Sequence, residues 1–439
     1  MAQATKTTLD AILKEFYLGP VQEQLNNEVL VLNLFEKMSV DWNGKKAIVP
    51  IHTARNSSVE FKTETDPLPT AQVQTYKRLE IEAKYLYGRF EITGVAVASA
   101  RNGGKGAFIG WMEAEMNKLV DDIKNSANHN LVTGGDIIGF ITSSTNATVQ
   151  AFQGDFSKIT VGDALHVLDA SQPGFQSDGT TMKNTTFLDS TAGTGVADTV
   201  TVINEAAGLL TFNAAITPPA GATGYANAVR RGTTLAAGGV ESVGILSNLF
   251  GGGVKATGAG EVEHFGVVRG GNAREATLDC VVRSVNPTNG AGAASLGDLT
   301  SERIQIVLDD VNELSGESPD CILVHPTTRS NYVGMLTSTM QATSRGGASN
   351  GDGGFLDLSY GNIPMKVSRH VPKGMMIFLS LKTWKLLELQ SGGFADLDGS
   401  ALSRVADKDA WEGFYRWYYN TVCVRPNANA VLTGIDIYS

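Results

Sequence analysis

The stretch that decides the fold is Gly106–Val132, which reads GAFIGWMEAEMNKLVDDIKNSANHNLV. Its apolar residues recur at steps of three and four, and this spacing places them on one stripe of an α-helix. They are Ile109, Met112, Met116, Leu119, Ile123, Ala127 and Leu131. The charged residues lie mainly off the stripe, so we expect one side to pack and the other to meet water or a polar neighbour.

The predicted helix is long. At 1.5 Å per residue it would span roughly 39 Å, two to three times an average helix. Gly103, Gly104 and Gly106 lead into it, and Gly134 and Gly135 follow it with the residue type that best ends a helix. We interpret this helix as a strut. Taken alone, the stretch is more typical of a long core helix in an ordinary enzyme.

Composition narrows the class of protein. A chain of 439 residues with 42% hydrophobic residues predicts two to four domains with real cores. Its 49 glycines indicate many turns. Charged residues make up only 18%, which fits a surface largely buried by copies of the same chain. The formal charge of −10 argues against a nucleic-acid clamp, because phosphate binding needs a basic face.

The cysteines and the lengths of the apolar runs indicate in which cellular compartment the protein is made. Cys280, Cys321 and Cys423 are far apart with no CxxC pair, so we expect three buried small hydrophobes instead of disulfides or a zinc site. The first residues do not read as a signal sequence, and no apolar run is long enough to cross a bilayer. We therefore expect a soluble protein made in a reducing cytoplasm.

The N-terminal region reads as two helices. The first is a short amphipathic pattern that starts near Thr7 and stops at Gly19-Pro20. The second runs from Val21 to Phe35 with a wide apolar face. Such a face has to be covered, either by the core of this chain or by a neighbouring subunit.

Strand patterns follow from Lys45 to Thr93. The expected strands are Ala47–Ile51, Val73–Ala83 and Tyr85–Thr93, and a polar tip, Thr53–Thr70, separates the first two. The first two strands would form a long hairpin arm with too few apolar residues for a core of its own. Because an isolated hairpin is marginal in water, this arm is held by contacts outside its own domain or is folded back onto that domain.

Residues 141–229 have a different character. They contain neither Trp nor Cys, and seven acidic residues stand against two basic ones. Short strands punctuated by turn residues predict a small β-barrel or sandwich inserted into a host domain. The expected strands are Phe156–Val161, Ala164–Leu168, Thr199–Ile203 and Gly208–Phe212.

Alternating helix and strand patterns then return. We expect a helix over Leu299–Leu314, a buried strand in Pro319–Pro326, and a second helix over Arg329–Met340. A glycine- and serine-rich loop, Gln341–Gly354, follows. Further strands are expected at Ile363–Ser368, at Met375–Leu379, and at Phe414–Val424, the last inside a sheet covered on both sides.

Motifs for catalysis, metal binding or phosphate binding are missing. The histidines His52, His129, His166, His264, His325 and His370 are scattered, without HExxH spacing. Gly251–Gly253 and Gly103–Gly106 lack the spacing of a phosphate loop. Asp396 and Asp398 begin like a calcium loop, but the glycine comes too early and the closing glutamate is missing. We predict no catalytic, cofactor or metal residues, and a protein that is not an enzyme.

The order of these elements resembles the major capsid protein of tailed double-stranded-DNA bacteriophages, whose lambdoid-type fold is shared with encapsulins. Matching parts are an N-terminal helical arm (Thr7–Phe35), a β-hairpin "E-loop" (Lys45–Ala83), the spine helix (Gly106–Val132) and an axial-domain run, Pro319–Ser330. Three C-terminal runs follow in the family's order, namely Gly361–Ser368, Val371–Phe378 and Arg425–Leu432.

The resemblance implies an α+β fold with an N-arm, an E-loop hairpin, a peripheral domain that holds the spine helix, an axial domain and the inserted β domain. The implied domains are 1–44, 45–93, 94–140, 141–229 and 230–439. Candidate hinges are Gly88, Gly94, Gly134-Gly135 and the Gln341–Gly354 loop. Lys62 would be the donor if the shell were locked by an isopeptide bond, as in some relatives.

The implied function is structural: self-assembly into pentamers and hexamers of an icosahedral head. Implied partners are copies of itself, a scaffolding protein, a portal and cement or decoration proteins. The head would enclose DNA without specific binding, with no membrane and no cofactor. The chain would be found in the virion, and in the host cytoplasm during assembly.

Two other classes stay open. One is an encapsulin-type cellular compartment shell with the same fold. The other is a β-rich secreted, glycan-binding or glycan-active protein, which the acidic β region suggests and the missing signal sequence opposes.

Overall fold

The computed structural model describes most of the chain between residues 29 and 436. The described residues are 29–35, 37–39, 46–56, 58–95, 105–133, 137–144, 148–154, 156, 159–169, 198–205, 207–214, 227–231, 242–250, 262–265, 267–269, 278, 280–285, 297–340, 358–395, 403–405 and 408–436. The first predicted N-terminal helix, the part of the second before residue 29, the Gln341–Gly354 loop, Gly134-Gly135 and the Asp396 and Asp398 turn lie outside them.

The long helix is confirmed. It is α2, Lys105–Thr133, and its 29 residues give a length of about 43 Å. Ile123, Ala127 and Leu131 lie on the predicted apolar stripe and are buried. Near the C-terminal end the buried surface is wider than one stripe, because Asn128, His129, Val132 and Thr133 are buried as well. The helix therefore ends inside the protein body and runs out of it toward its N-terminus.

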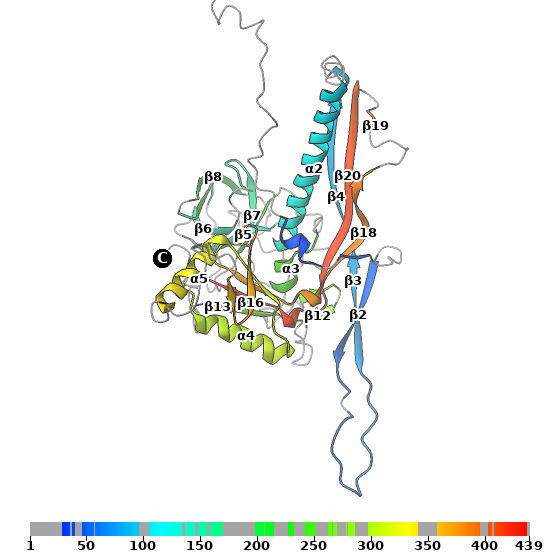
Figure 1. The fold of residues 1–439 in the computed structure, drawn as a ribbon. Helices are drawn as coiled ribbons and strands as arrows, with labels where there is room; N and C mark the ends of the chain where they lie inside the picture. Colours follow the sequence, from blue (N-terminus) through cyan, green and yellow to red (C-terminus); the bar gives the residue numbers. More distant parts are fainter. Residues whose placement is uncertain are drawn as a thin grey trace, which may run out of the picture.

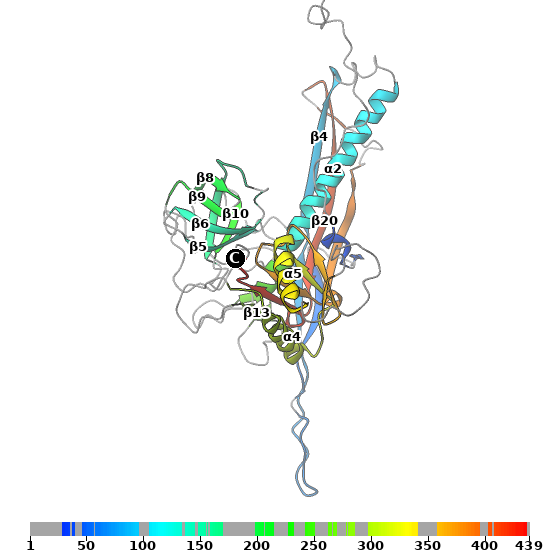
Figure 2. The same cartoon turned by 60° about the vertical axis from the view of Figure 1, so that its left-hand side comes forward.

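A long sheet accompanies α2. Its central strand is β20 (Ala410–Cys423), which pairs antiparallel with β18 (Trp384–Phe394) and with β4 (Lys84–Thr93). Two short strands complete it: β1 (Lys37–Ser39) is parallel to β18, and β19 (Ser403–Arg404) pairs with β20. In Figures 1 and 2, α2, β4 and β20 run side by side away from the body.

Strand β20 is covered on both sides only in part. Residues 419–423 are all buried, as predicted, whereas from Phe414 to Tyr418 buried and half-exposed residues alternate. Tyr415, Trp417 and Tyr419 pack in the core that also contains Ile123 of α2. The opposite face carries Tyr418, and nothing in the described part of the chain covers that face completely. The predicted burial on both sides was therefore wrong for residues 414–418. Aromatic residues stand on both faces of this part of the strand, so the sequence shows a continuous apolar run although only one face is buried.

Gly88 marks the closest approach of β4 to α2. A Cβ atom there would overlap Ile123 Cδ1 and would lie 3.2 Å from Leu119 Cδ1. We expect Gly88→Val to lower the free energy of unfolding by about 1–3 kcal/mol through overpacking. Gly393→Val in β18 is the matched control, because no heavy atom lies within 4 Å of the added Cβ. Urea unfolding checks both, and equal losses in the two variants would contradict this packing.

A six-stranded sheet forms the body. Its order is β13-β21-β17-β14-β16-β15. The strands are β13 (Val281–Ser284), β14 (Cys321–Val324), β15 (Ser359–Tyr360), β16 (Ile363–Val367), β17 (Met376–Leu379) and β21 (Ala430–Thr433). Along β14, Ile322 and Val324 pack with Ile304 and Val307 of α4, whereas Cys321 and Leu323 pack in the core of α2. The sheet is thus buried on both faces.

Two helices cover one face of that sheet. Helix α4 (Ser301–Ser315) starts at Thr300, whose side chain accepts a hydrogen bond from the Arg303 amide, and ends at Gly316 in a left-handed conformation with φ 70°. Helix α5 (Pro326–Met340) begins three residues earlier than predicted. Proline ended the predicted strand but also suits the first helical turn, where its missing N–H costs nothing. A short helix, α3 (Ile245–Phe250), lies on the α2 side.

The residues before the hairpin arm pack on this chain's own core. A short 3-10 helix, η1 (Val31–Asn33), is followed by Phe35, whose ring stacks on Trp384 at 5.5 Å between centroids. The Leu32 amide donates to Asn128 Oδ1 of α2 at 2.9 Å. Of the predicted helix Val21–Phe35, the described residues 29–35 form only this 3-10 turn, and their apolar side chains are covered within the subunit.

The hairpin arm consists of β2 (Lys46–Ala54), β3 (Thr75–Glu82) and the residues between them. The strands pair antiparallel from Lys46 with Glu82 to Ala54 with Thr75, so the second strand starts two residues later than predicted. Figures 1 and 2 show the arm projecting from the body, opposite to the outer end of α2. It is not folded back, which decides between the two interpretations of the sequence.

The base of the arm is anchored in a small core. Ala47, Ile51, Leu79 and Ile81 pack with Leu278, Leu387 and Val422, among others. A hairpin of β11 (Val262–His264) and β12 (Val267–Arg269) closes this core, and the Glu80 amide donates to Phe265 O at 3.0 Å. The arm is therefore fixed at its base.

The inserted domain is a closed six-stranded barrel with the order β10-β5-β6-β9-β8-β7. Its strands are β5 (Ile137–Ser144), β6 (Val149–Gly154), β7 (Ala164–Asp169), β8 (Asp198–Asn204), β9 (Leu209–Phe212) and β10 (Asn227–Arg231). Three of the four predicted strands are confirmed, and β5, β6 and β10 were not predicted. The strand predicted at Phe156–Val161 is wrong, because the Ile159 amide donates to Phe156 O in a turn and both side chains fill the barrel core.

Candidate functional site: the arm tip and the cleft at its base

The arm tip, residues 58–73, exposes large apolar side chains. The exposed fractions are 87% for Val59, 106% for Phe61, 89% for Leu68 and 84% for Val73. A stable monomer gains nothing from holding four such side chains in water on one projection. The tip is therefore a candidate contact surface for another molecule.

The tip is also acidic. It carries Glu60, Glu64 and Asp66 against one lysine, Lys62. Lys62 Nζ lies 2.8 Å from Glu60, so the pair neutralises itself. Asp66 accepts hydrogen bonds from Thr63, which lower the pKa of its carboxyl group and keep it ionised. Glu64 is exposed and has no partner among the residues that the structure describes.

Local hydrogen bonds hold the neck of the tip. Asn56 Nδ2 donates to Gln72 O at 2.7 Å across the two chains of the hairpin, and the Ser58 amide donates to Asn56 Oδ1 at 2.8 Å. Between Ala54 and Thr75, however, no ladder of strand hydrogen bonds remains. The tip has a defined course but no core.

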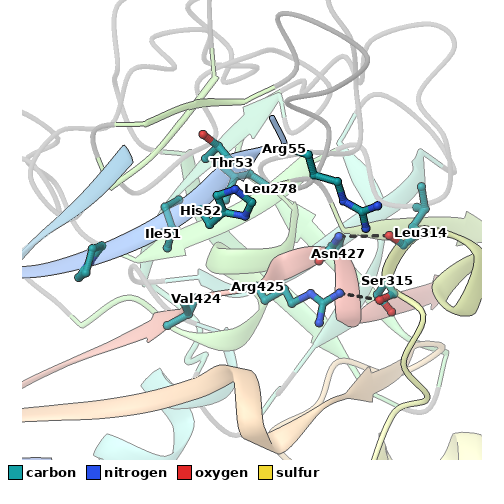
Figure 3. Close-up of a pocket in the computed structure, with 11 residues that line it drawn as sticks. Ile51, His52, Thr53, Arg55, Leu278, Leu314, Ser315, Val424, Arg425 and Asn427 are labelled. Carbon is teal, nitrogen blue, oxygen red and sulfur yellow. Dashed lines mark hydrogen bonds between the residues drawn. The ribbon is translucent and has the colours of Figure 1, made fainter. Parts of the chain in front are cut away.

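A cleft of about 510 Å³ lies at the base of the arm. Its residues come from β2, from the C-terminal end of α4 and from the chain around η5 (Pro426–Ala428), and Figure 3 shows how they face one another. They are Pro50, Ile51, His52, Thr53, Arg55, Leu278, Leu314, Ser315, Val424, Arg425 and Asn427. We call this the base cleft. Among the described residues, its lining includes two arginines and a histidine and no acidic residue, although the chain as a whole has a charge of −10.

The two arginines of the base cleft have different roles. Arg425 is held in place: it pairs with Glu317 at 2.7 Å and donates to Ser315 O at 2.5 Å. Asn427 Nδ2 donates to Leu314 O at 3.4 Å, so both carbonyls at the end of α4 have donors (Figure 3). Arg55 reaches from the end of β2 toward this side of the cleft and has no partner among the described residues. The base cleft thus presents one uncommitted positive charge.

A second exposed surface lies on the face of the long sheet that α2 leaves open. Tyr85 and Tyr87 are 56% and 57% exposed, and both contact Tyr418 edge to face. The Tyr87 hydroxyl donates to the Tyr418 hydroxyl at 3.1 Å, and this bond raises the pKa of Tyr87. Beside them, Arg89 pairs with Glu412 at 2.6 Å. Exposed aromatic rings beside an ion pair are typical of a contact surface for a neighbouring molecule and not of a catalytic site.

The histidines serve structural contacts. His129 and His370 meet edge to face at 5.3 Å between α2 and the body, His264 contacts Cys423 O at 2.8 Å, and His325 contacts Thr327 at the start of α5. Only His52, in the base cleft, lies on a candidate surface, and His166 lies on β7 of the barrel. Within the described ranges no three His, Cys, Asp or Glu side chains gather as a metal site would require.

The cysteines are buried and free, as predicted. Burial raises the pKa of Cys321 to about 12, so its thiol stays protonated at neutral pH. We expect none of the three thiols of the folded chain to react with a chromogenic disulfide reagent at pH 8, and all three to react in denaturant. Fast reaction of one thiol in the folded chain would contradict this burial.

No described helix combines the length and the apolar character needed to cross a bilayer. The sequence could not have revealed the base cleft. Arg55 and Arg425 come from opposite ends of the chain, and no spacing links them. The sequence prediction of a polar tip over Thr53–Thr70 was wrong, because Val59, Phe61 and Leu68 stand singly among polar residues and give no periodic apolar pattern.

Comparisons with known proteins address the fold. No protein-family model matches the sequence, and no curated protein matches it. Among solved structures, the chain is similar to a subunit of the cyanophage A-1(L) capsid, with a TM-score of 0.58 and 12% identity over 98% of this chain and 99% of that chain. It is also similar to the capsid of a native GTA particle, with a TM-score of 0.50 and 7% identity over 99% and 100%. Identities of this size speak for the fold alone.

Proposed function

Because this chain has the tailed-phage major capsid fold, with the spine helix, the E-loop hairpin and an inserted barrel, we propose that it is a structural shell protein. Copies of the chain assemble into the pentamers and hexamers of an icosahedral head that encloses double-stranded DNA. The role is structural and not enzymatic. The protein resides in the virion, after assembly in the host cytoplasm.

The observation that carries this proposal is the hairpin arm. Its base belongs to the core of the subunit, whereas its tip exposes Phe61 and Leu68 almost fully on a projection without a core. Burial of such side chains stabilises by roughly 1.5–3 kcal/mol each, and only a second molecule provides that burial here. A shell of many copies provides it for every arm at once.

The charge of the chain fits an enclosed genome. A subunit with a formal charge of −10 repels packaged DNA, which lets the genome move during packaging and ejection. Specific DNA binding is therefore not part of the proposal. Binding of DNA to the purified chain that is insensitive to salt would contradict it.

The finer assignments are proposals of the same kind. The domains are those given by the resemblance, with the barrel extended to the limits of its strands, Ile137 and Arg231. A scaffolding protein, a portal and cement or decoration proteins are the proposed further partners. A lock through Lys62 remains a prediction, and its test is a denaturing gel of heated particles, on which linked subunits run as multimers.

The test is to express the whole chain and examine it by sedimentation and electron microscopy. We expect closed particles of uniform size, alone or with a scaffolding protein from the same source. A folded chain that stays monomeric under all these conditions would contradict the proposal. An encapsulin-type compartment, the second candidate, would form shells that are filled with cargo protein, and particles purified from the native source that contain DNA decide against it.

A further inference from the structure

The arm tip and the base cleft carry complementary features on the same chain. The base cleft has an apolar floor, formed by Ile51 and Leu278 at 8% and 4% exposure, and a basic rim. The arm tip has a fully exposed phenylalanine, Phe61, and three residues after it the carboxylate of Glu64. Each surface leaves one charge uncommitted among the described residues: Arg55 on the cleft and Glu64 on the tip.

The two surfaces of one molecule do not meet. The ladder between β2 and β3 runs without reversal up to Ala54 and Thr75, and the tip continues away from the body (Figures 1 and 2). Glu64 lies nine residues beyond Arg55, in the turn between Thr63 and Asp66 at the outer end of the projecting arm. Contact between the two surfaces therefore requires two molecules, and it joins different surfaces of the two copies. Such a head-to-tail contact repeats from one subunit to the next, and it gives a pentamer or hexamer ring when the rotation between copies closes.

We propose that the base cleft receives the arm tip of a second copy of this chain, with Phe61 of that copy over the apolar floor and its Glu64 paired with Arg55. This inference rests on the proposed function and names the site at which one subunit completes the next. Arg425 is already held by Glu317 and Ser315, so it shapes the cleft while Arg55 takes the incoming carboxylate. An arginine–carboxylate pair also fixes orientation, because its two parallel hydrogen bonds require one geometry.

The proposed occupant is favoured by charge. A basic cleft on an acidic chain attracts an acidic projection, and every copy carries such a tip at high concentration during assembly. The remaining carboxylate near the cleft, Glu317, is occupied by Arg425 and does not compete for Arg55.

Disulfide trapping tests the contact directly. The chain with Arg55→Cys and Glu64→Cys is assembled, oxidised and run on a non-reducing denaturing gel. We expect a ladder of covalent multimers, because the new thiols of adjacent copies would meet. The three native cysteines are buried and add no background. The matched control combines Glu64→Cys with Glu302→Cys, an exposed residue at the other end of α4, and should give monomers.

A charge exchange tests the pairing. We expect Arg55→Glu and Glu64→Arg each to raise the concentration needed for assembly about tenfold or more, since each places like charges at the contact. The double variant restores the pair in reversed orientation and should assemble nearly as the unaltered chain does. Thermal melting confirms that each variant folds, which is expected because both side chains are exposed.

The outcomes separate the two proposals. Normal particles with no ladder from the Arg55–Glu64 cysteine pair, or a ladder of equal strength from the control pair, would overturn the docking site and leave the shell function intact. A double charge variant no better than the single ones would also overturn the pairing. If the unaltered chain forms no particles under any condition, the shell function fails and the docking site fails with it.

Discussion

Replacing Asn429 with leucine is expected to destabilise the subunit by about 4 kcal/mol, because it leaves two buried donors without acceptors. Asn429 is fully buried beside the last strand of the body. Its Oδ1 accepts from the Ser380 amide and from Trp384 Nε1, both at 2.9 Å. Trp384 is 1% exposed, so water does not replace the lost acceptor.

The amide nitrogen of Asn429 also has hydrogen-bond partners. Its Nδ2 donates to Thr383 Oγ1 and to Arg425 O, both at 3.1 Å. The residue thus ties the end of β20, the start of β18 and the turn at η5 together. It also holds the chain that leads into the base cleft, so its loss should weaken assembly as well as folding.

Urea unfolding of the unassembled chain is the measurement for this variant. Asn312→Leu is the matched control: it makes the same change at an exposed position of α4, where about 0.5 kcal/mol or less is expected. A loss below about 1 kcal/mol for Asn429→Leu would contradict the account of this hydrogen-bond centre.

The second large effect is expected on assembly and not on folding. Changing both Phe61 and Leu68 to serine should abolish particles, because it removes the apolar contacts that a neighbouring subunit would bury. Both side chains are about fully exposed in the single chain, so the melting temperature should stay within a few degrees of the original value.

The control for the Phe61 and Leu68 variant is a pair of exposed valines on the inserted barrel. Val161 and Val202 are 64% and 54% exposed, and changing both to serine removes exposed apolar side chains from a different surface. We expect this control to form particles. Normal assembly of the Phe61 and Leu68 variant would contradict the role of the tip, and so would loss of assembly in the control alone.

The elements with regular periodicity could be predicted from the sequence. The three- and four-residue steps predicted α2 and α4 to within one or two residues at each end. The alternation around Val73–Ala83 predicted the second strand of the arm, and its lack of apolar residues predicted that the arm has no core. These features depend on local spacing, which the sequence displays.

The barrel shows where local spacing is insufficient. Phe156 and Ile159 look like strand residues, yet they fill the barrel core from a turn. Strand β5 carries no polar and apolar alternation strong enough to distinguish it from a linker after the spine helix. Closure of a barrel depends on pairings between distant strands, such as β5 with β10, and these are not visible in a single segment.

The sequence predicted an arm that is held by contacts outside its own domain or is folded back, but it predicted no site residues. It described the tip as polar and did not identify Phe61 as an exposed contact residue. The base cleft could not be predicted, because it is assembled from β2, the end of α4 and the last residues before β21. Its charge arises from the side chains that tertiary packing leaves unpaired, and Arg55 was one basic residue among many in the sequence.

Hydrogen exchange tests most directly whether neighbouring subunits complete the arm. Amide exchange over residues 58–73 is measured in the unassembled chain and in the assembled particle, with β20 as an internal reference. We predict fast exchange of the tip in the free chain and strong protection in the particle, while β20 is protected in both. Tip amides that are already protected in the free chain, or that exchange equally fast in the particle, would contradict the account.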